Sequence, residues 1–176
     1  LQHAERDGRI APGDTVIVAP GYYTEPLNIV MSGNTAQWIT YYADDDGRFF
    51  DMPGGVMLDP AAGPGINFSF YSYNAVYGFE YTGQGSGTGV VMRSANNRGY
   101  DCEIENVDLV ASLDGAGQLS LIDNEFKNCS LYGIQNDNTA DDLAIHENMI
   151  VDCGRGIQLN GLGTNITVKE NWIINC

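Results

Sequence analysis

The chain has 176 residues, the size of one domain with its own core, and we expect a single domain over residues 1–176. Only 18% of the residues are charged and 22 are Gly, which disfavours a helical bundle. A net charge of −15 would repel nucleic acid and anionic membranes, and no apolar run reaches the roughly 18 residues of a membrane-spanning helix, so we expect neither as a partner.

The first quarter of the chain predicts strands without a visible repeat. Thr15–Ala19 and Trp38–Tyr42 are rich in β-branched and aromatic residues, which favour extended structure. The dipeptide Pro20-Gly21 predicts a turn directly after the first of these strands.

Two segments further along carry an Asn among alternating apolar residues. Phe68–Tyr81 contains Asn74, and Glu103–Val110 contains Asn106. We expect both to be weaker copies of the repeat that is clear near the C-terminus. Asn106 lies only 18 residues before Asn124, which predicts a tightened coil or a changed register at that point.

The last third of the chain contains three segments that align without a gap: Leu119–Cys129, Leu143–Cys153 and Ile166–Cys176. Their Asn residues, Asn124, Asn148 and Asn171, lie 24 and 23 positions apart, and a Cys follows each Asn five positions later. Apolar residues alternate before each Asn and resume two positions after it, which predicts a strand, a corner and a second strand. A Gly-containing turn and a third short strand complete the unit.

A repeat of this length predicts a solenoid. About 23 residues at roughly 3.3 Å each give a perimeter near 76 Å, which accommodates three short strands and their corners. We therefore expect an all-β, right-handed, single-stranded parallel β-helix of about seven coils, in which each coil contacts only its neighbours. We assign Asn to the corners because it tolerates a left-handed backbone and because stacked amides can bond from coil to coil.

The runs APGDTVIVAPGYYTEPLNI (Ala11–Ile29), SGNTAQWITYYA and YNAVYGFEYTG (Tyr73–Gly83) make the resemblance specific. The chain resembles bacterial right-handed β-helix proteins of the pectate lyase-like superfamily, and its first coils resemble alginate and chondroitin lyases. The resemblance implies a short amphipathic capping helix over Leu1–Ile10, an acidic polysaccharide as the partner, and an extracellular or periplasmic location. The catalytic signatures of these families are absent from the chain, so the resemblance indicates a superfamily and no particular reaction.

An acidic residue precedes the corner Asn in four successive units, namely Glu105, Asp123, Glu147 and Glu170. If these units stack, the carboxylates form a ladder with about 1 kcal/mol of repulsion per neighbouring pair in water. Calcium would relieve that repulsion, because it prefers carboxylate oxygens. The alternative is a solvated edge at which salt screens the charges.

One position earlier, the same units carry Ile122, His146 and Lys169, which the strand alternation turns outward. A His stacked on a Lys beside carboxylates could abstract the proton of a uronate, which β-elimination requires. His146 and Lys169 are therefore the catalytic candidates. The alternative is a mixed polar face on which Lys169 pairs with Glu147 or Glu170.

Two acidic loops and one aromatic cluster complete the candidates. The loops Asp44–Gly47 and Asn136–Asp142 lack the spacing of an EF-hand, so we expect solvated loops. The aromatic residues of Phe68–Tyr81 alternate, so that half should point inward, while the outward ones pack under a loop or stack on sugar rings.

The cysteines Cys129, Cys153 and Cys176 keep the register of the repeat, and we expect an internal stack of free thiols without disulfides. The sequence stops within a repeat, which would leave the last coil with unpaired edges. We expect either that the natural protein continues or that two chains form a homodimer through their C-terminal coils.

Two functional hypotheses follow from the sequence. The first is a carbohydrate-directed β-helix that binds acidic polysaccharide or derives from a polysaccharide lyase. The second is a structural solenoid without catalysis, which self-associates through its last coil.

Overall fold

The computed structural model describes residues 9–113, 117–137, 141–161 and 163–176, in which 20 strands form three parallel sheets. Sheet A contains β1 (Thr15–Val18), β4 (Ile39–Ala43), β7 (Asn74–Tyr77), β10 (Asn97–Tyr100), β13 (Leu119–Ile122), β16 (Leu143–His146) and β19 (Thr167–Lys169). Sheet B contains β2 (Gly21–Tyr23), β5 (Val56–Leu58), β8 (Phe79–Thr82), β11 (Glu103–Glu105), β14 (Glu125–Lys127), β17 (Met149–Val151) and β20 (Trp172–Ile174). Sheet C contains β3 (Leu27–Asn28), β6 (Ile66–Asn67), β9 (Thr88–Met92), β12 (Leu109–Leu113), β15 (Tyr132–Asn136) and β18 (Ile157–Leu159).

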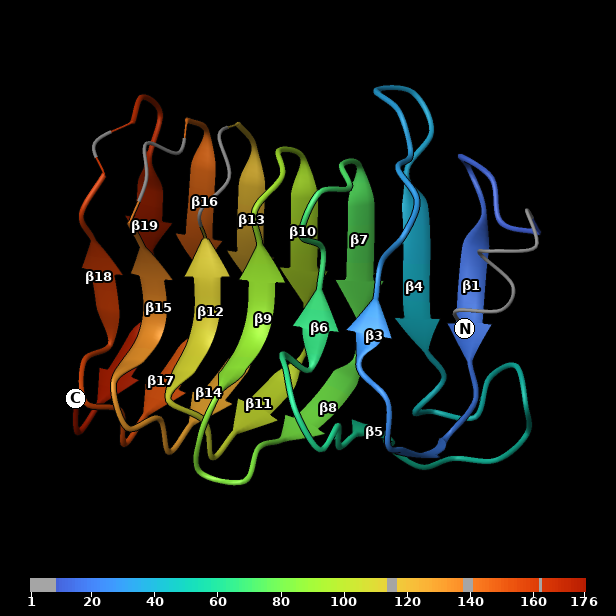
Figure 1. The fold of residues 1–176 in the computed structure, drawn as a ribbon, viewed down its shortest axis with the longest axis horizontal. Helices are drawn as coiled ribbons and strands as arrows, with labels where there is room; N and C mark the ends of the chain where they lie inside the picture. The colour runs from blue at the N-terminus through green and yellow to red at the C-terminus, as the bar shows by residue number, and fades with distance from the viewer. Residues whose placement is uncertain (1–8, 114–116, 138–140, 162) are drawn as a thin grey trace.

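The chain passes through sheets A, B and C in turn, so that each circuit is one coil of a parallel β-helix. The coils follow one another along the long axis of the molecule from the first to the last (Figure 1). About seven coils are present, as predicted. The described residues contain no helix, and hence none that could cross a membrane. Most of the expected capping helix over Leu1–Ile10 lies outside the described residues, and Arg9 and Ile10 are not helical.

Inward-facing apolar side chains fill the coils because strand residues alternate between the core and the surface. In sheet B, for example, Ile104 lies between Tyr81 and Phe126 in the neighbouring coils, and all three are buried. The predicted alternation of the aromatic segment holds within β8, where Phe79 and Tyr81 are buried, but fails before β7, where Phe68 is buried and Phe70 is exposed because a turn separates them. Stacking of equivalent residues therefore makes one continuous core.

The predicted Asn ladder is present. The Nδ2 of Asn124 donates to the Oδ1 of Asn148 at 2.9 Å, and the Nδ2 of Asn148 donates to the Oδ1 of Asn171 at 2.9 Å. Each Oδ1 also accepts the backbone N–H of the preceding coil, beginning with Cys102, which donates to Asn124 at 3.0 Å. Asn124 and Asn148 are buried, so these bonds satisfy amides that water does not reach.

The expected left-handed conformation falls one residue earlier than predicted. Asp123, Glu147 and Glu170 have φ values of 56°, 61° and 57°, whereas the ladder Asn residues do not have positive φ. The acidic residue therefore turns the corner, and the following Asn supplies the hydrogen bonds between coils.

Two assignments of upstream corners were wrong. Asn106 lies past the end of β11, and in its place Asp101 and Cys102 are equivalent to Asp123 and Asn124. Asn74 lies at the start of β7 and pairs with Asn97, whose Oδ1 accepts its backbone N–H at 3.1 Å. The coils thus have two Asn corners, and sequence spacing alone did not separate them.

The cysteines stack as predicted, but the expectation of free thiols throughout was wrong. Cys129 and Cys153 form a disulfide between neighbouring coils, with their Cα atoms 4.4 Å apart. Cys102 and Cys176 are free. Equivalent side chains in successive coils lie one strand spacing apart, about 4.8 Å, and this closeness allows the bond.

Candidate functional site: an acidic groove between sheets A and B

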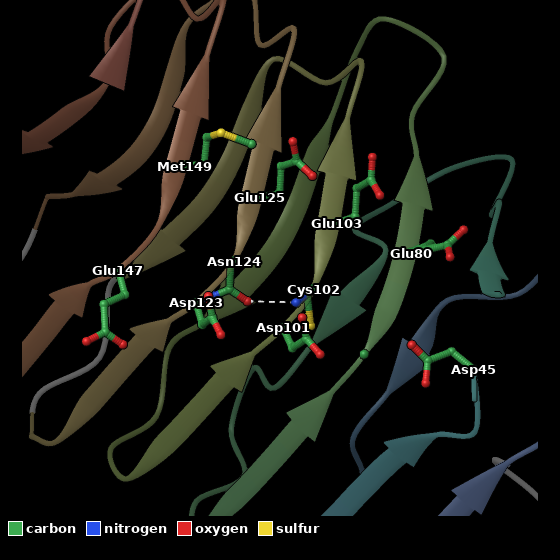
Figure 2. A pocket seen from close by; sticks show the side chains of 11 residues that line it. Asp45, Glu80, Asp101, Cys102, Glu103, Asp123, Asn124, Glu125, Glu147 and Met149 are labelled. Atoms are coloured by element: carbon green, nitrogen blue, oxygen red, sulfur yellow. Dashed lines mark hydrogen bonds between the residues drawn. The ribbon is translucent and has the colours of Figure 1, made fainter. Parts of the chain in front are cut away.

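A groove of about 330 Å³ follows the corner between sheets A and B, and seven carboxylates line it. They come from Asp45, Glu80, Asp101, Glu103, Asp123, Glu125 and Glu147. Figure 2 shows two rows, with Glu80, Glu103 and Glu125 along sheet B and Asp101, Asp123 and Glu147 along the corner. We call this feature the acidic groove.

The corner row consists of the residues that directly precede the ladder positions. Asp101, Asp123 and Glu147 all adopt the left-handed conformation, with φ between 51° and 61°. This row contains the predicted metal candidates Asp123 and Glu147, while Glu170 continues it by one coil outside the groove lining. The prediction that Glu105 belongs to this row was wrong, because Glu105 lies at the end of β11 opposite Lys127. Asp101 occupies that position of the row instead.

The sheet B row was not predicted. Parallel pairing places Glu103 opposite both Glu80 and Glu125. Lys127 lies beside this row, and its Nζ is 2.9 Å from Glu103 and 2.8 Å from Glu125. These bonds to two carboxylates raise the pKa of Lys127, which stays charged and neutralises part of the row.

Burial and mutual repulsion act on two of the carboxylates. The pKa of Glu80 is raised by burial and by the negative charges of Glu103 and Asp45. The pKa of Asp101 is raised by burial and by the charges of Asp123 and Asp45. The acidic groove is therefore a region of negative potential in which a positive charge would be stabilised.

Asp45 reaches the acidic groove from the long loop that follows β4. The neighbouring Asp44 is fully buried, and its carboxylate accepts the backbone N–H groups of Phe49 and Phe50 at 2.8–3.1 Å. Asp44 therefore shapes the loop that carries Asp45. The expectation of a merely solvated loop was thus incomplete, because one of its carboxylates lines the groove.

Three tyrosines form a ladder on sheet A beside the corner row. Tyr42 pairs in register with Tyr77, and Tyr77 pairs with Tyr100. The rings of Tyr77 and Tyr100 stack with centroids 4.7 Å apart and planes 10° apart. Burial, followed by the neighbouring Tyr100, raises the pKa of Tyr77. The facing sides of Tyr77 and Tyr100 are thus already in contact with each other, whereas Tyr42 and Tyr77 are tilted by 37° with centroids 6.5 Å apart.

The outward row of sheet A brings His146 and Lys169 together as the strand alternation predicted. The two residues are direct partners in β16 and β19. His146 Nδ1 lies 3.8 Å from a carboxylate oxygen of Glu147, and Lys169 Nζ lies 3.6 Å from Glu170. Neither His146 nor Lys169 lines the acidic groove, and their catalytic role stays a prediction.

The described residues contain no cluster of three or more His, Cys, Asp or Glu side chains arranged to hold a metal ion. The carboxylates of the acidic groove instead follow one another along two lines. Any cation there would need oxygen ligands from elsewhere to complete its shell of six to eight. In the loop Asn136–Asp142, residues 138–140 lie outside the described residues, and Asp141 accepts the backbone N–H of Thr164 at 2.8 Å.

The fold and this groove define a right-handed parallel β-helix with a polar face along one corner. The family model described as "Right handed beta helix region" matches residues 49–176. The chain belongs to this family. A search of curated proteins gives no match.

A search of solved structures gives a mutant of the PL6 family alginate lyase AlyGC, at 11% identity and a TM-score of 0.38. The match covers 88% of this chain and 39% of that chain, so this chain spans well under half of the lyase.

Proposed function

We propose that this protein binds an acidic polysaccharide along the acidic groove, with calcium ions held between the groove carboxylates and those of the glycan. The observation that carries the proposal is the double row of carboxylates on one extended groove. Neighbouring strands lie about 4.8 Å apart, so adjacent carboxylates of a row repel by roughly 1 kcal/mol even at the dielectric constant of water. A divalent cation removes this repulsion.

The backbone of the corner row supports a role for these carboxylates in binding. Glu147 and Glu170 occupy left-handed positions, which Asn, Asp or Gly adopt with less strain. At Glu147 this costs backbone energy and places a longer carboxylate beside the groove, whereas Glu170 lies one coil beyond the groove lining. Strained residues of this kind cluster at ligand sites.

The glycan would complete the calcium shell. Because the protein ligands are spread along two rows, each ion would take one or two carboxylates from the protein and further oxygens from the polymer. An acidic polymer is otherwise repelled by a chain of net charge −15. Binding therefore depends on calcium, and no catalytic step is part of the proposal.

The test is isothermal titration calorimetry with oligogalacturonate and alginate oligosaccharides. We expect binding in millimolar calcium and its loss in EDTA. The double variant Asp101→Asn with Asp123→Asn should weaken it at least tenfold, because two ligands of the corner row lose their charge. Affinity should also fall as the pH is lowered towards 5, because protons compete at the raised pKa values of Glu80 and Asp101.

The matched control is Glu25→Gln, which removes one exposed carboxylate away from the acidic groove and should leave binding unchanged. Equal affinity in calcium and EDTA would contradict the proposal, as would full binding by the double variant.

A further inference from the structure

A hollow of about 290 Å³ lies on sheet C, where β3 and β6 end side by side (Figure 1). It is lined by residues 28–30, 67 and 69–71, and we call it the Phe70 hollow. None of these lining residues is charged, although the chain carries a net charge of −15. The Phe70 hollow therefore differs from the acidic groove both in its place on the fold and in its charge.

Phe70 is the most prominent side chain of the Phe70 hollow. It is 82% exposed, although exposing an aromatic ring to water is unfavourable. The nearby Phe68 is fully buried, and a tight turn closed by Tyr71 N–H donating to Phe68 O at 2.8 Å separates the two rings. The fold therefore anchors one ring in the core and holds the other in solvent at the edge of the hollow.

The turn that presents Phe70 is fixed by polar bonds. Asn67 Nδ2 donates to Asn28 Oδ1 in the neighbouring coil at 3.1 Å, and Asn67 Oδ1 accepts the backbone N–H of Ser69 at 3.1 Å and also its hydroxyl. Ser69 has a φ of 21°, a positive value that residues other than Gly rarely adopt and that is found at ligand sites. Phe70 is thus held in position before any ligand arrives, which reduces the entropy that binding costs.

Asn28 supplies polar donors to the Phe70 hollow. Its Oδ1 accepts the bond from Asn67, which orients the amide. Within the part of the chain that the structure describes, the Asn28 Nδ2 has no acceptor, and the residue is only partly buried. The two N–H groups of this amide can therefore donate to oxygen atoms of a ligand.

One exposed aromatic ring, an amide donor and an uncharged lining together match a neutral saccharide. A sugar ring has an apolar face of C–H groups that packs on an aromatic ring, and its hydroxyl oxygens accept hydrogen bonds at the rim. A specific protein partner would bury about 800 Å² of this chain, whereas a hollow of 290 Å³ has the size of a small-molecule site. An anionic ligand would be repelled by the net charge and would find no lining cation.

We propose that the Phe70 hollow binds a neutral saccharide without calcium. The apolar face of one sugar ring stacks on Phe70, and an oxygen of that sugar accepts a hydrogen bond from Asn28 Nδ2. This site goes beyond the proposed function and does not depend on it.

The experiment is a titration in EDTA followed by calorimetry and by amide NMR shifts. The probes are cellohexaose and mannohexaose as neutral ligands and hexagalacturonate as the acidic one. We expect at least one neutral probe to bind at least ten times more tightly than the acidic probe, with shifts concentrated in residues 28–30 and 67–71. The two neutral arms show whether an equatorial or an axial 2-hydroxyl is preferred.

Phe70→Ala should weaken this binding at least tenfold, whereas Phe70→Tyr keeps the aromatic face and should retain it. Asn28→Asp preserves the acceptor for Asn67 but loses both donors, and it should weaken binding severalfold. Phe50→Ala is the matched aromatic control, because Phe50 is exposed on a different loop. Asn34→Asp is the matched amide control, because the Asn34 Oδ1 also accepts protein bonds and Asn34 does not line the hollow. Both controls should bind as the parent does.

Three results would each overturn the proposal: no binding of either neutral probe, equal affinity for the acidic probe, or full binding by Phe70→Ala. The double variant Asp101→Asn with Asp123→Asn should bind the neutral probe normally, since it changes only the acidic groove. Failure at the Phe70 hollow is therefore distinct from failure of the calcium-dependent site.

Discussion

At the scale of single residues, two adjacent residues have different structural roles at the corner between sheets A and B. The acidic residue adopts the left-handed conformation that turns the chain, and the Asn behind it links three coils. Asn148 shows the arrangement best, because its Nδ2 donates to Leu121 O, His146 O and Asn171 Oδ1 while its Oδ1 accepts from Asn124. The carboxylate side chains can therefore face the groove, because the hydrogen bonds that join the coils are made by the adjacent Asn residues.

Asn148→Ala should destabilise the protein by about 3 kcal/mol, because it leaves several buried backbone and amide groups without partners. Urea unfolding followed by circular dichroism measures this change. As a control, Asn160→Ala removes an exposed amide that donates to Asp137 and accepts from Gln158, and it should cost less than about 0.5 kcal/mol. Equal losses in the two variants would contradict the role of the buried ladder.

At the scale of elements, neighbouring coils are joined by parallel pairing and, at one place, by a covalent bond. The disulfide between Cys129 and Cys153 closes a loop of 24 residues and links the coil of β13–β15 to that of β16–β18. The last coil continues the same pairing through β19 and β20. Self-association through that coil stays a prediction.

Reducing this disulfide should lower the free energy of unfolding by about 3 kcal/mol, the loop-closure entropy for a loop of this length. Thiol titration of the denatured, non-reduced protein should find two reactive groups, Cys102 and Cys176. Cys129→Ala should remove the sensitivity to reductant. Four reactive thiols would contradict the assignment. Because disulfides persist in oxidising compartments, the bond supports the extracellular or periplasmic location that we propose.

At the scale of the whole molecule, the charge is concentrated and its cost depends on pH. Burial raises the pKa of Glu80 and of Asp101, so their contribution to stability is complete at low pH and is lost as the pH rises through the folded-state values. Asp108 and Asp141 behave oppositely, because hydrogen bonds from Ser130 and Thr164 lower their pKa values. Their contribution is lost as the pH falls.

We therefore expect the Tm to rise as the pH is lowered from 7 towards about 5, and to fall again below about 4. Differential scanning calorimetry across this range measures the profile. Glu80→Gln should flatten the rise, since it removes one of the two carboxylates with a raised pKa. A Tm that falls steadily between pH 7 and 5 would show that the groove carboxylates are not under strain.

The sequence predicted the fold well because two residue types kept a common period in the last three coils. It predicted the site only in part. Cys102 occupies the first rung of the ladder, where the later coils have Asn, so the sequence did not show that Asp101 is equivalent to Asp123. Asn106, which lies at another corner, was mistaken for the ladder residue of that coil. The long loop after β4 separates Tyr42 from Tyr77 by 35 residues, which concealed the tyrosine ladder. The spacing of Glu80, Glu103 and Glu125 by 23 and 22 residues could have revealed the second row.

The Asn ladder also has a direction. The bonds that ladder residues make to an Asn Oδ1 all run from a donor in the earlier coil to an oxygen in the later one. Each ladder Asn Nδ2 also donates to a backbone carbonyl of the preceding coil. The opening rung needs only a backbone N–H, which explains why a residue without an amide, Cys102, suffices there. Each later rung must supply both an acceptor and a donor. The coils are therefore not interchangeable. A coil with Cys at the ladder position can begin the Asn ladder but cannot replace a coil in the middle of it.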